Sequence, residues 1–150
     1  MLRMALRGLS HPRGNSIAIT KAETQIVWSA ANNLSVSAGS TGTSDAFTFD
    51  ATSFNATITL KADNNGTPTS GDKVDFYLLY TNGDPDGTSS DEYDSATQGT
   101  WLATLDTNTN DPAQTTVAIN PSAKGGKIYA KNNAGSNGIT VSATMYETKG

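Results

Sequence analysis

Short runs in which apolar and polar residues alternate recur from residue 16 to the end of the chain. A β-strand points successive side chains to opposite faces, so this alternation is typical of half-buried strands. The pattern predicts strands within residues 16–30, 34–36, 47–49, 54–60, 73–81, 101–105, 117–119, 127–131 and 139–145. No segment shows a helical period longer than one turn. We therefore expect an all-β fold, an antiparallel β-sandwich or jelly roll of about eight strands.

The run from residue 73 to residue 81 is apolar on both faces of its expected strand. The alternation gives one face Val74, Phe76, Leu78 and Tyr80 and the other face Asp75, Tyr77 and Leu79. A strand of this kind lies centrally in a sheet or presents its second face to another protein. We predict that Tyr77 and Leu79 contact a partner.

Turn-forming residues divide the expected strands. A Ser/Thr/Gly-rich segment at 39–44 and Asn-Asn-Gly at 64–66 predict tight turns. The alternation slips by one residue between Phe54 and Ile58, which predicts a bulge or a bend. Residues 82–99 form a polar loop whose length is unusual inside a compact domain unless the loop has a function or a partner.

Charge divides the chain into an extended basic N-terminal arm, residues 1–15, and one domain, residues 16–150. The arm contains Arg3, Arg7 and Arg13 and no acid, whereas the rest of the chain is acidic, with all of the lysines and all 14 carboxylates. An acidic domain offers no broad cationic surface to phosphates, so we expect no direct binding of nucleic acid. No apolar run approaches the roughly 20 residues that a bilayer requires, so we expect no membrane partner.

The residue types needed for most catalysis are scarce. The chain has no cysteine, and its one histidine, His11, lies in the arm. A nucleophilic triad would have to use that histidine, and no nucleophile-elbow motif occurs. We therefore expect a protein that is not an enzyme and needs no cofactor.

The loop around residues 84–94 is the one candidate metal site. It gathers Asp84, Asp86, Asp91, Glu92 and Asp94. Alternating oxygen ligands beside a glycine resemble a calcium loop, but Pro85 and Ser95 occupy positions where such a loop needs other residues. The same acids could act in a glycosidase, yet a loop of Ser, Thr and Gly gives no dry setting to raise a carboxyl pKa. We expect a solvated loop.

Aromatic residues on a sandwich face could stack on sugar rings. The candidates are Trp28, Trp101, Tyr77, Tyr80 and Tyr129. They alternate with aliphatic residues in the register expected of a core, which is the role that we predict for them. A carbohydrate-binding β-sandwich module, as in a tail or fibre adhesin, remains the alternative function.

Four segments together resemble the small β-sandwich virion proteins of tailed bacteriophages that decorate, or cement, the capsid. These segments are residues 71–80, 101–105, 119–124 and 127–133. The resemblance implies a non-enzymatic virion structural protein that is made in the host cytoplasm and bridges subunits on the outer surface of the capsid. Its partners would be the major capsid protein and neighbouring copies of itself, in a homo-oligomer such as a trimer or dimer. It does not separate a head protein from a tail component.

The arm has two interpretations, a solubilising tail or a docking arm. Cationic and apolar residues interleave along it, which suits an arm pressed onto a protein surface. The expected contact residues are Leu2, Arg3, Met4, Leu6, Arg7, Leu9 and Arg13.

Overall fold

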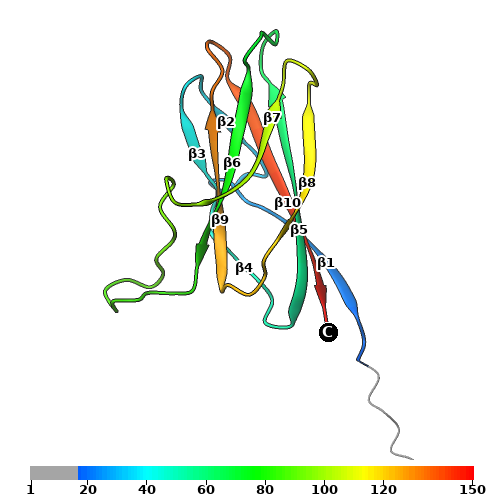
Figure 1. Ribbon diagram of the computed structural model, residues 1–150, viewed down its shortest axis with the longest axis vertical. Helices are drawn as coiled ribbons and strands as arrows, with labels where there is room; N and C mark the ends of the chain where they lie inside the picture. The colour runs from blue at the N-terminus through cyan, green and yellow to red at the C-terminus, as the bar shows by residue number, and fades with distance from the viewer. Residues whose placement is uncertain (1–16) are drawn as a thin grey trace, which may run out of the picture.

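Ten strands and no helix make up residues 17–150, which are the residues that this computed structural model describes (Figure 1). The strands are β1 (Thr20–Gln25), β2 (Leu34–Val36), β3 (Thr41–Thr43), β4 (Phe47–Thr48), β5 (Ser53–Asn64), β6 (Lys73–Thr81), β7 (Thr100–Asp106), β8 (Ala113–Ile119), β9 (Gly125–Asn132) and β10 (Ile139–Lys149). Within these residues, no helix is present that could cross a membrane. The predicted arm, residues 1–15, lies outside the described residues.

The strands form two antiparallel sheets. Sheet I has the order β1–β10–β5–β8, with β2 also paired to β10, and sheet II has the order β3–β9–β6–β7, with β4 also paired to β9. In sheet I, β1 and β2 share the outer position next to β10, and in sheet II, β3 and β4 share the outer position next to β9. Each sheet therefore has four strand positions. The chain passes between the sheets after β2, β4, β5, β7, β8 and β9, which gives the connectivity of a jelly roll. The predicted fold class is confirmed.

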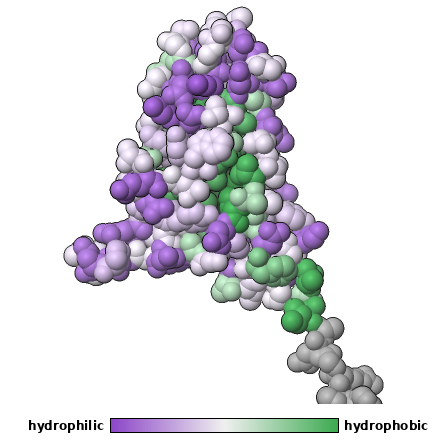
Figure 2. Space-filling model, viewed as in Figure 1, coloured by the Kyte–Doolittle hydropathy of each residue, from purple (hydrophilic) through white to green (hydrophobic). Residues whose placement is uncertain are grey.

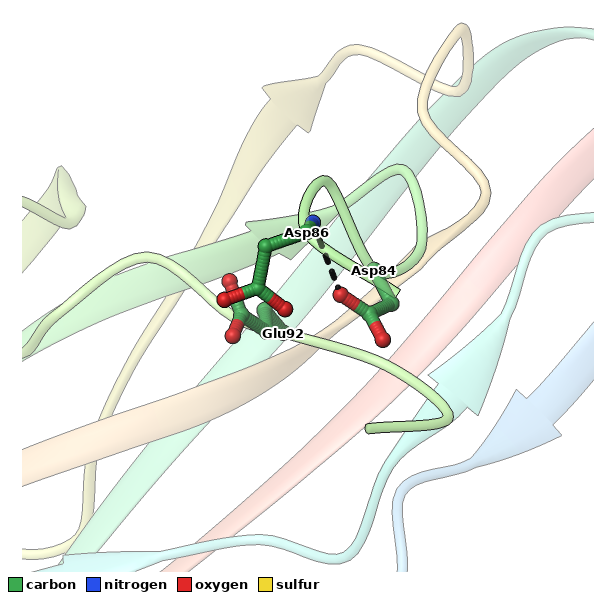
Figure 3. Close-up of side chains that lie close together, drawn as sticks. All are labelled: Asp84, Asp86 and Glu92. Atoms are coloured by element: carbon green, nitrogen blue, oxygen red, sulfur yellow. Dashed lines mark hydrogen bonds between the residues drawn. The ribbon is translucent and has the colours of Figure 1, made fainter. Parts of the chain in front are cut away.

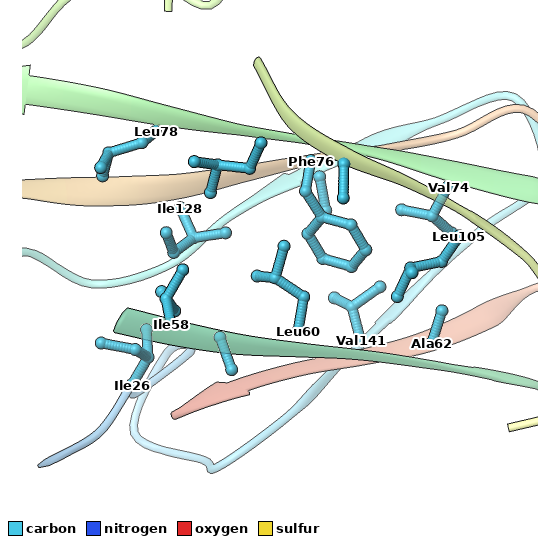
Figure 4. Packing of buried hydrophobic residues seen from close by; sticks show 14 of the residues in the cluster. Ile26, Ile58, Leu60, Ala62, Val74, Phe76, Leu78, Leu105, Ile128 and Val141 are labelled. Atoms are coloured by element: carbon cyan, nitrogen blue, oxygen red, sulfur yellow. The ribbon is translucent and has the colours of Figure 1, made fainter. Parts of the chain in front are cut away.

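The core lies between the two sheets and is built by the alternating positions of the long central strands (Figure 4). Ile58 and Leu60 of β5 face Phe76 and Leu78 of β6, and all four side chains are fully buried. The strand predicted at 73–81 is confirmed, and it lies in the interior of sheet II, as its two apolar faces indicated.

One predicted turn is wrong. The segment at 39–44 contains strand β3, which pairs with β9 through residues 41–43. The glycine at its centre faces inward, and a Cβ atom there would lie 2.4 Å from Cδ2 of Leu34. Gly42 therefore serves close packing between β2 and β3 rather than a turn.

Two bulges adjust which side chains face outward. The pairing of β10 with β5 skips Phe54, next to the slip that the sequence showed, and Phe54 is 59% exposed. The pairing of β6 with β7 skips Leu102, so that Phe76 lies opposite Ala103 and Tyr77 opposite Trp101. An extra residue of this kind turns the following side chains to the other face. Leu102 is consequently buried, and Trp101 faces solvent.

A polar network closes the end of the sandwich opposite the long loop. Asp72 is 1% exposed, and its Oδ2 accepts hydrogen bonds from the Thr69 amide and from the side chains of Asn64 and Asn137. The Thr69 bond, followed by the Asn137 bond, lowers the pKa of Asp72. This carboxylate holds three loop segments together in its ionised form.

Candidate functional site

Three aromatic residues form a row across the outer face of sheet II. The register of the strands places Tyr129 of β9 opposite Tyr77 of β6, and Tyr77 opposite Trp101 of β7. Residues directly opposite each other in an antiparallel pair point to the same face. Because the flanking Phe76 and Leu78 are fully buried in the core, this face is the outer one. We call Tyr129, Tyr77 and Trp101 the aromatic row.

The three rings differ in how they are held. The rings of Tyr77 and Tyr129 meet edge to face, with their centroids 6.0 Å apart and their planes at 61°. Both side chains are half-buried, so the contact fixes their positions. Trp101 is 58% exposed at the edge strand β7. The row thus combines a fixed pair with one open indole face.

Polar groups flank the row on the side toward Asp72. Asp75 of β6 accepts hydrogen bonds from the Thr104 hydroxyl at Oδ1 and from the Asn133 side chain at Oδ2, the latter at 2.8 Å. Lys131 lies opposite Asp75 in the pairing of β9 with β6, and it is exposed. A ligand on the aromatic row would find hydrogen-bonding groups next to an apolar platform.

The loop of residues 82–99 borders the row on its other side. Figure 1 shows this loop projecting from the sandwich and returning toward β7. Nζ of Lys127 lies 4.3 Å from the centroid of the Tyr93 ring, and Lys124 forms an ion pair with Asp91. The loop is therefore attached to β9 and its preceding turn.

The loop also bounds an open hollow of about 540 Å³. Its lining includes Tyr80, Asn82, Asp84, Tyr93, Asp94 and Gln98. The amide of Asp94 donates to the Tyr80 carbonyl, and the Tyr80 amide donates to Oδ2 of Asp94, so the far wall of the hollow is tied to β6.

Three carboxylates of this loop lie close together (Figure 3). Asp84, Asp86 and Glu92 each offer an oxygen within 4.8 Å of the others, a group that could hold a hard cation. Yet Oδ1 of Asp84 accepts the Asp86 and Gly87 amides, and Oδ1 of Asp86 accepts the Thr88 amide and hydroxyl. The Thr88 hydroxyl is the main cause of the lowered pKa of Asp86. The carboxylates of Asp84 and Asp86 therefore organise the turns of the loop with their own hydrogen bonds.

The structure divides the predicted aromatic candidates. Trp28 is 1% exposed and belongs to the core, as predicted. Tyr80 packs against the core and its hydroxyl accepts the Asn120 amide. The prediction of a core role is wrong for Tyr77, Tyr129 and Trp101, since all three point outward from sheet II.

Of the two partner-contact residues predicted on β6, only Tyr77 lies on the open part of the outer face. Tyr77 belongs to the aromatic row, but Leu79 is only 6% exposed. The returning loop covers it, since a Cβ atom on Gly99 would lie 2.6 Å from Cδ2 of Leu79. Leu79 is thus unavailable to a partner, because a segment distant in sequence lies over it.

The other predicted contact residues lie outside the described residues, since all of them precede residue 17. The adjoining described residues do form an apolar patch. Ile17 and Ile19 are 75% and 65% exposed, and Phe54 on β5 is 59% exposed. Figure 2 shows hydrophobic surface at the end of the domain where the described part of the chain begins. We call Ile17, Ile19 and Phe54 the N-terminal apolar patch.

No protein-family model matches the chain, and no curated protein matches it. One solved structure with a similar arrangement contains the CBM22-1–GH10 modules of xylanase 10B from Clostridium thermocellum in complex with xylohexaose. The sequence identity is 13% and the TM-score is 0.48, and the match covers 77% of this chain and 20% of the xylanase chain. The C-terminal CBM6 of a laminarinase from Zobellia galactanivorans has 14% identity and a TM-score of 0.45, over 87% of this chain and 99% of that one. A pilus subunit of Bacillus endospore appendages has 13% identity and a TM-score of 0.37, over 96% and 100%. The chain therefore spans about a fifth of the xylanase chain.

Proposed function

We propose that this chain is a non-catalytic carbohydrate-binding jelly roll that holds a polysaccharide on the outer face of sheet II. The observation that carries the proposal is the aromatic row, in which Tyr129, Tyr77 and Trp101 share one face and one register. The C–H faces of pyranose rings are apolar and stack on aromatic rings, whereas their hydroxyls need hydrogen-bond partners. The row supplies the first kind of contact, and Asp75 and its neighbours supply the second.

The shape of the site supports a polymer rather than a small ligand. Small-molecule sites are concave and enclose most of their ligand. The aromatic row instead crosses three adjacent strands of an open sheet face. Since neighbouring strands lie about 4.8 Å apart, the row extends over roughly 10 Å. A surface of this kind suits a chain of sugars lying across the strands.

The three carboxyl groups with displaced pKa values do not have the property that glycoside hydrolysis needs. Hydrogen bonds lower the pKa of Asp72 and Asp86, and the Lys149 side chain is the main cause that lowers the pKa of Asp50 to about 2. A general acid for glycoside hydrolysis needs the opposite, a raised pKa. These three carboxylates are therefore unsuited to donate a proton near neutral pH.

Affinity gel electrophoresis of the full chain through a panel of soluble polysaccharides tests the proposal. We expect at least one polymer to retard the protein, and an assay of reducing ends to show no cleavage of that polymer. The variant Tyr146→Ala serves as the control, because Tyr146 is a 40% exposed aromatic residue on sheet I, away from the row. Unchanged migration through every polymer, or steady release of reducing ends, would refute the proposal.

A place on the surface of a virion is a second candidate function. One observation favours it: the N-terminal apolar patch includes Ile17 and Ile19, which follow the basic arm in the sequence, and exposed apolar clusters mark contact sites between proteins. Attachment to a lattice would multiply weak contacts by avidity. We expect deletion of residues 1–14 to weaken cosedimentation with capsids at an unchanged melting temperature. Equal cosedimentation of the full and shortened chains would contradict a docking role for the arm.

A further inference from the structure

We propose that the polysaccharide bound by the aromatic row is acidic, and that carboxylate groups of its uronic acid residues pair with Lys127 and Lys131. This inference rests on the proposed function, and it names the class of polymer. It follows from where the cationic side chains of an acidic protein lie.

The two lysines bracket one ring of the row. Lys127 and Lys131 stand two residues before and after Tyr129 on β9, so all three side chains leave the same face of the strand. A strand rises about 3.3 Å a residue, which places each lysine roughly 6.6 Å along the strand from Tyr129. A sugar stacked on Tyr129 would therefore have an ammonium group within reach on either side.

Neither lysine forms an ion pair with an acid within residues 17–150. The ion pairs of that part of the chain join Lys61 to Asp63, Lys124 to Asp91 and Lys149 to Asp50. Asp75 is the acid opposite Lys131, and the hydrogen bonds that its oxygens accept come from Thr104 and Asn133. Lys127 contacts the face of the Tyr93 ring, which leaves its charge in place.

A neutral polymer would bind this face less favourably than an acidic one. It would cover two ammonium groups and deprive them of water without supplying an opposite charge. A carboxylate on a sugar stacked on Tyr129 supplies a charged partner to the lysine on its own side of the ring. Charge complementarity therefore favours uronic acids over neutral sugars on this face.

The charge of the whole chain favours a carboxylate over denser anions. The formal net charge is −4, and five of the 14 acids lie in the loop that borders the row. A polymer with several sulfates a sugar would be repelled by this loop, and two free ammonium groups could not compensate for it. A single carboxylate on the stacked sugar needs only one lysine, and a lysine stands on either side of the ring.

Isothermal titration of the full chain with uronic acid polymers tests the inference. Polygalacturonate, alginate and glucuronoxylan would each be compared with their carboxyl-reduced counterparts, in which the same backbones carry no charge. We expect at least one acidic polymer to bind about tenfold more tightly than its reduced form, and to weaken as sodium chloride rises from 50 to 500 mM.

Charge-removing variants complete the test. Lys131→Gln and Lys127→Gln should each weaken binding of the acidic polymer by about threefold to fivefold, and neither should weaken binding of the reduced polymer. Lys21→Gln removes the same charge from β1 of sheet I and should have no effect.

Three outcomes would overturn the inference, and they differ in what they imply for the proposed function. Equal affinity for the acidic and reduced polymers would overturn the inference and leave the proposed function standing. Dextran sulfate that binds more tightly than any uronic acid polymer, and that depends on the same lysines, would overturn the assignment to carboxylates. An absence of binding to every polymer, charged or reduced, would overturn both the inference and the proposed function.

Discussion

Removal of the Trp101 side chain is the most direct perturbation of the aromatic row. Trp101 is 58% exposed, and a tryptophan side chain has about 250 Å² of surface, so about 145 Å² faces solvent. A sugar that stacks on one face of the indole would cover about half of this, or about 70 Å². At about 25 cal/mol for each Å², the contact contributes about 1.8 kcal/mol. Trp101→Ala should therefore raise the Kd for the polysaccharide about 20-fold.

The same exposure predicts a small effect on folding. Since most of the Trp101 side chain is already in water, Trp101→Ala should change the free energy of unfolding by less than about 1 kcal/mol. Urea denaturation of both proteins measures this change, and isothermal titration with the polymer that retards the wild-type protein measures the Kd. The large loss of affinity at nearly constant stability is the signature of a contact residue.

Tyr146→Ala is the matched control, because it removes an exposed aromatic side chain from the outer face of the other sheet. Its Kd should equal that of the wild-type protein. If Trp101→Ala binds as the wild-type protein does, or if Tyr146→Ala loses as much affinity, the polymer does not lie on the aromatic row.

Four further predictions concern the scaffold and the loop. Phe76→Ala should cost about 3–5 kcal/mol in urea denaturation, because Phe76 is fully buried between the sheets; a cost below 1 kcal/mol would place it outside the core. Gly42→Ala should cost about 1–3 kcal/mol, because its Cβ atom would lie 2.4 Å from Cδ2 of Leu34; an equal or higher stability would show that β3 is free to shift. The pKa of Asp50 is lowered to about 2, so its ion pair with Lys149 stabilises the fold fully above about pH 4 and loses this effect as the pH falls toward 2. The stability deficit of Asp50→Asn in an acid titration should shrink over that range, and a constant deficit would contradict the assignment. Because both Asp84 oxygens accept amides of the loop, 1 mM calcium chloride should leave the melting temperature unchanged, whereas a rise that Asp84→Asn abolishes would reveal a bound ion.

Local alternation was sufficient to predict most of the fold. The pattern over residues 73–81 predicts both the strand and its central place, because apolar side chains occur on both of its faces. The strand at 41–43 could not be predicted in this way. Its glycine is needed for a close approach to Leu34, and such a contact between residues of different strands leaves no periodic signal.

The aromatic row could not be predicted from the sequence alone, because it depends on the register in which β9, β6 and β7 pair. In β9, Tyr129 has the same parity as Lys127 and Lys131, and in β6, Tyr77 has the parity of Asp75. The charged neighbours mark these faces as outward, a signal that could have assigned both tyrosines correctly. Trp101 gives the opposite signal, because it shares its parity with Ala103 and Leu105. The bulge at Leu102 reverses its direction, and a bulge follows from pairing with β6 rather than from β7 alone.

The returning loop also fixes the direction in which a polymer can lie. Leu79 has the same parity as Tyr77, so the strand alone would extend an apolar surface lengthwise along β6. The backbone at Gly99 covers Leu79, and Tyr93 lies beneath Lys127 on the neighbouring strand, so this path is closed on the side of the loop. Across the strands the face stays open, from the exposed Thr43 on β3 to Trp101 on β7. A sugar chain on this face therefore has to cross the strands, and that direction is the one along which the three rings are aligned.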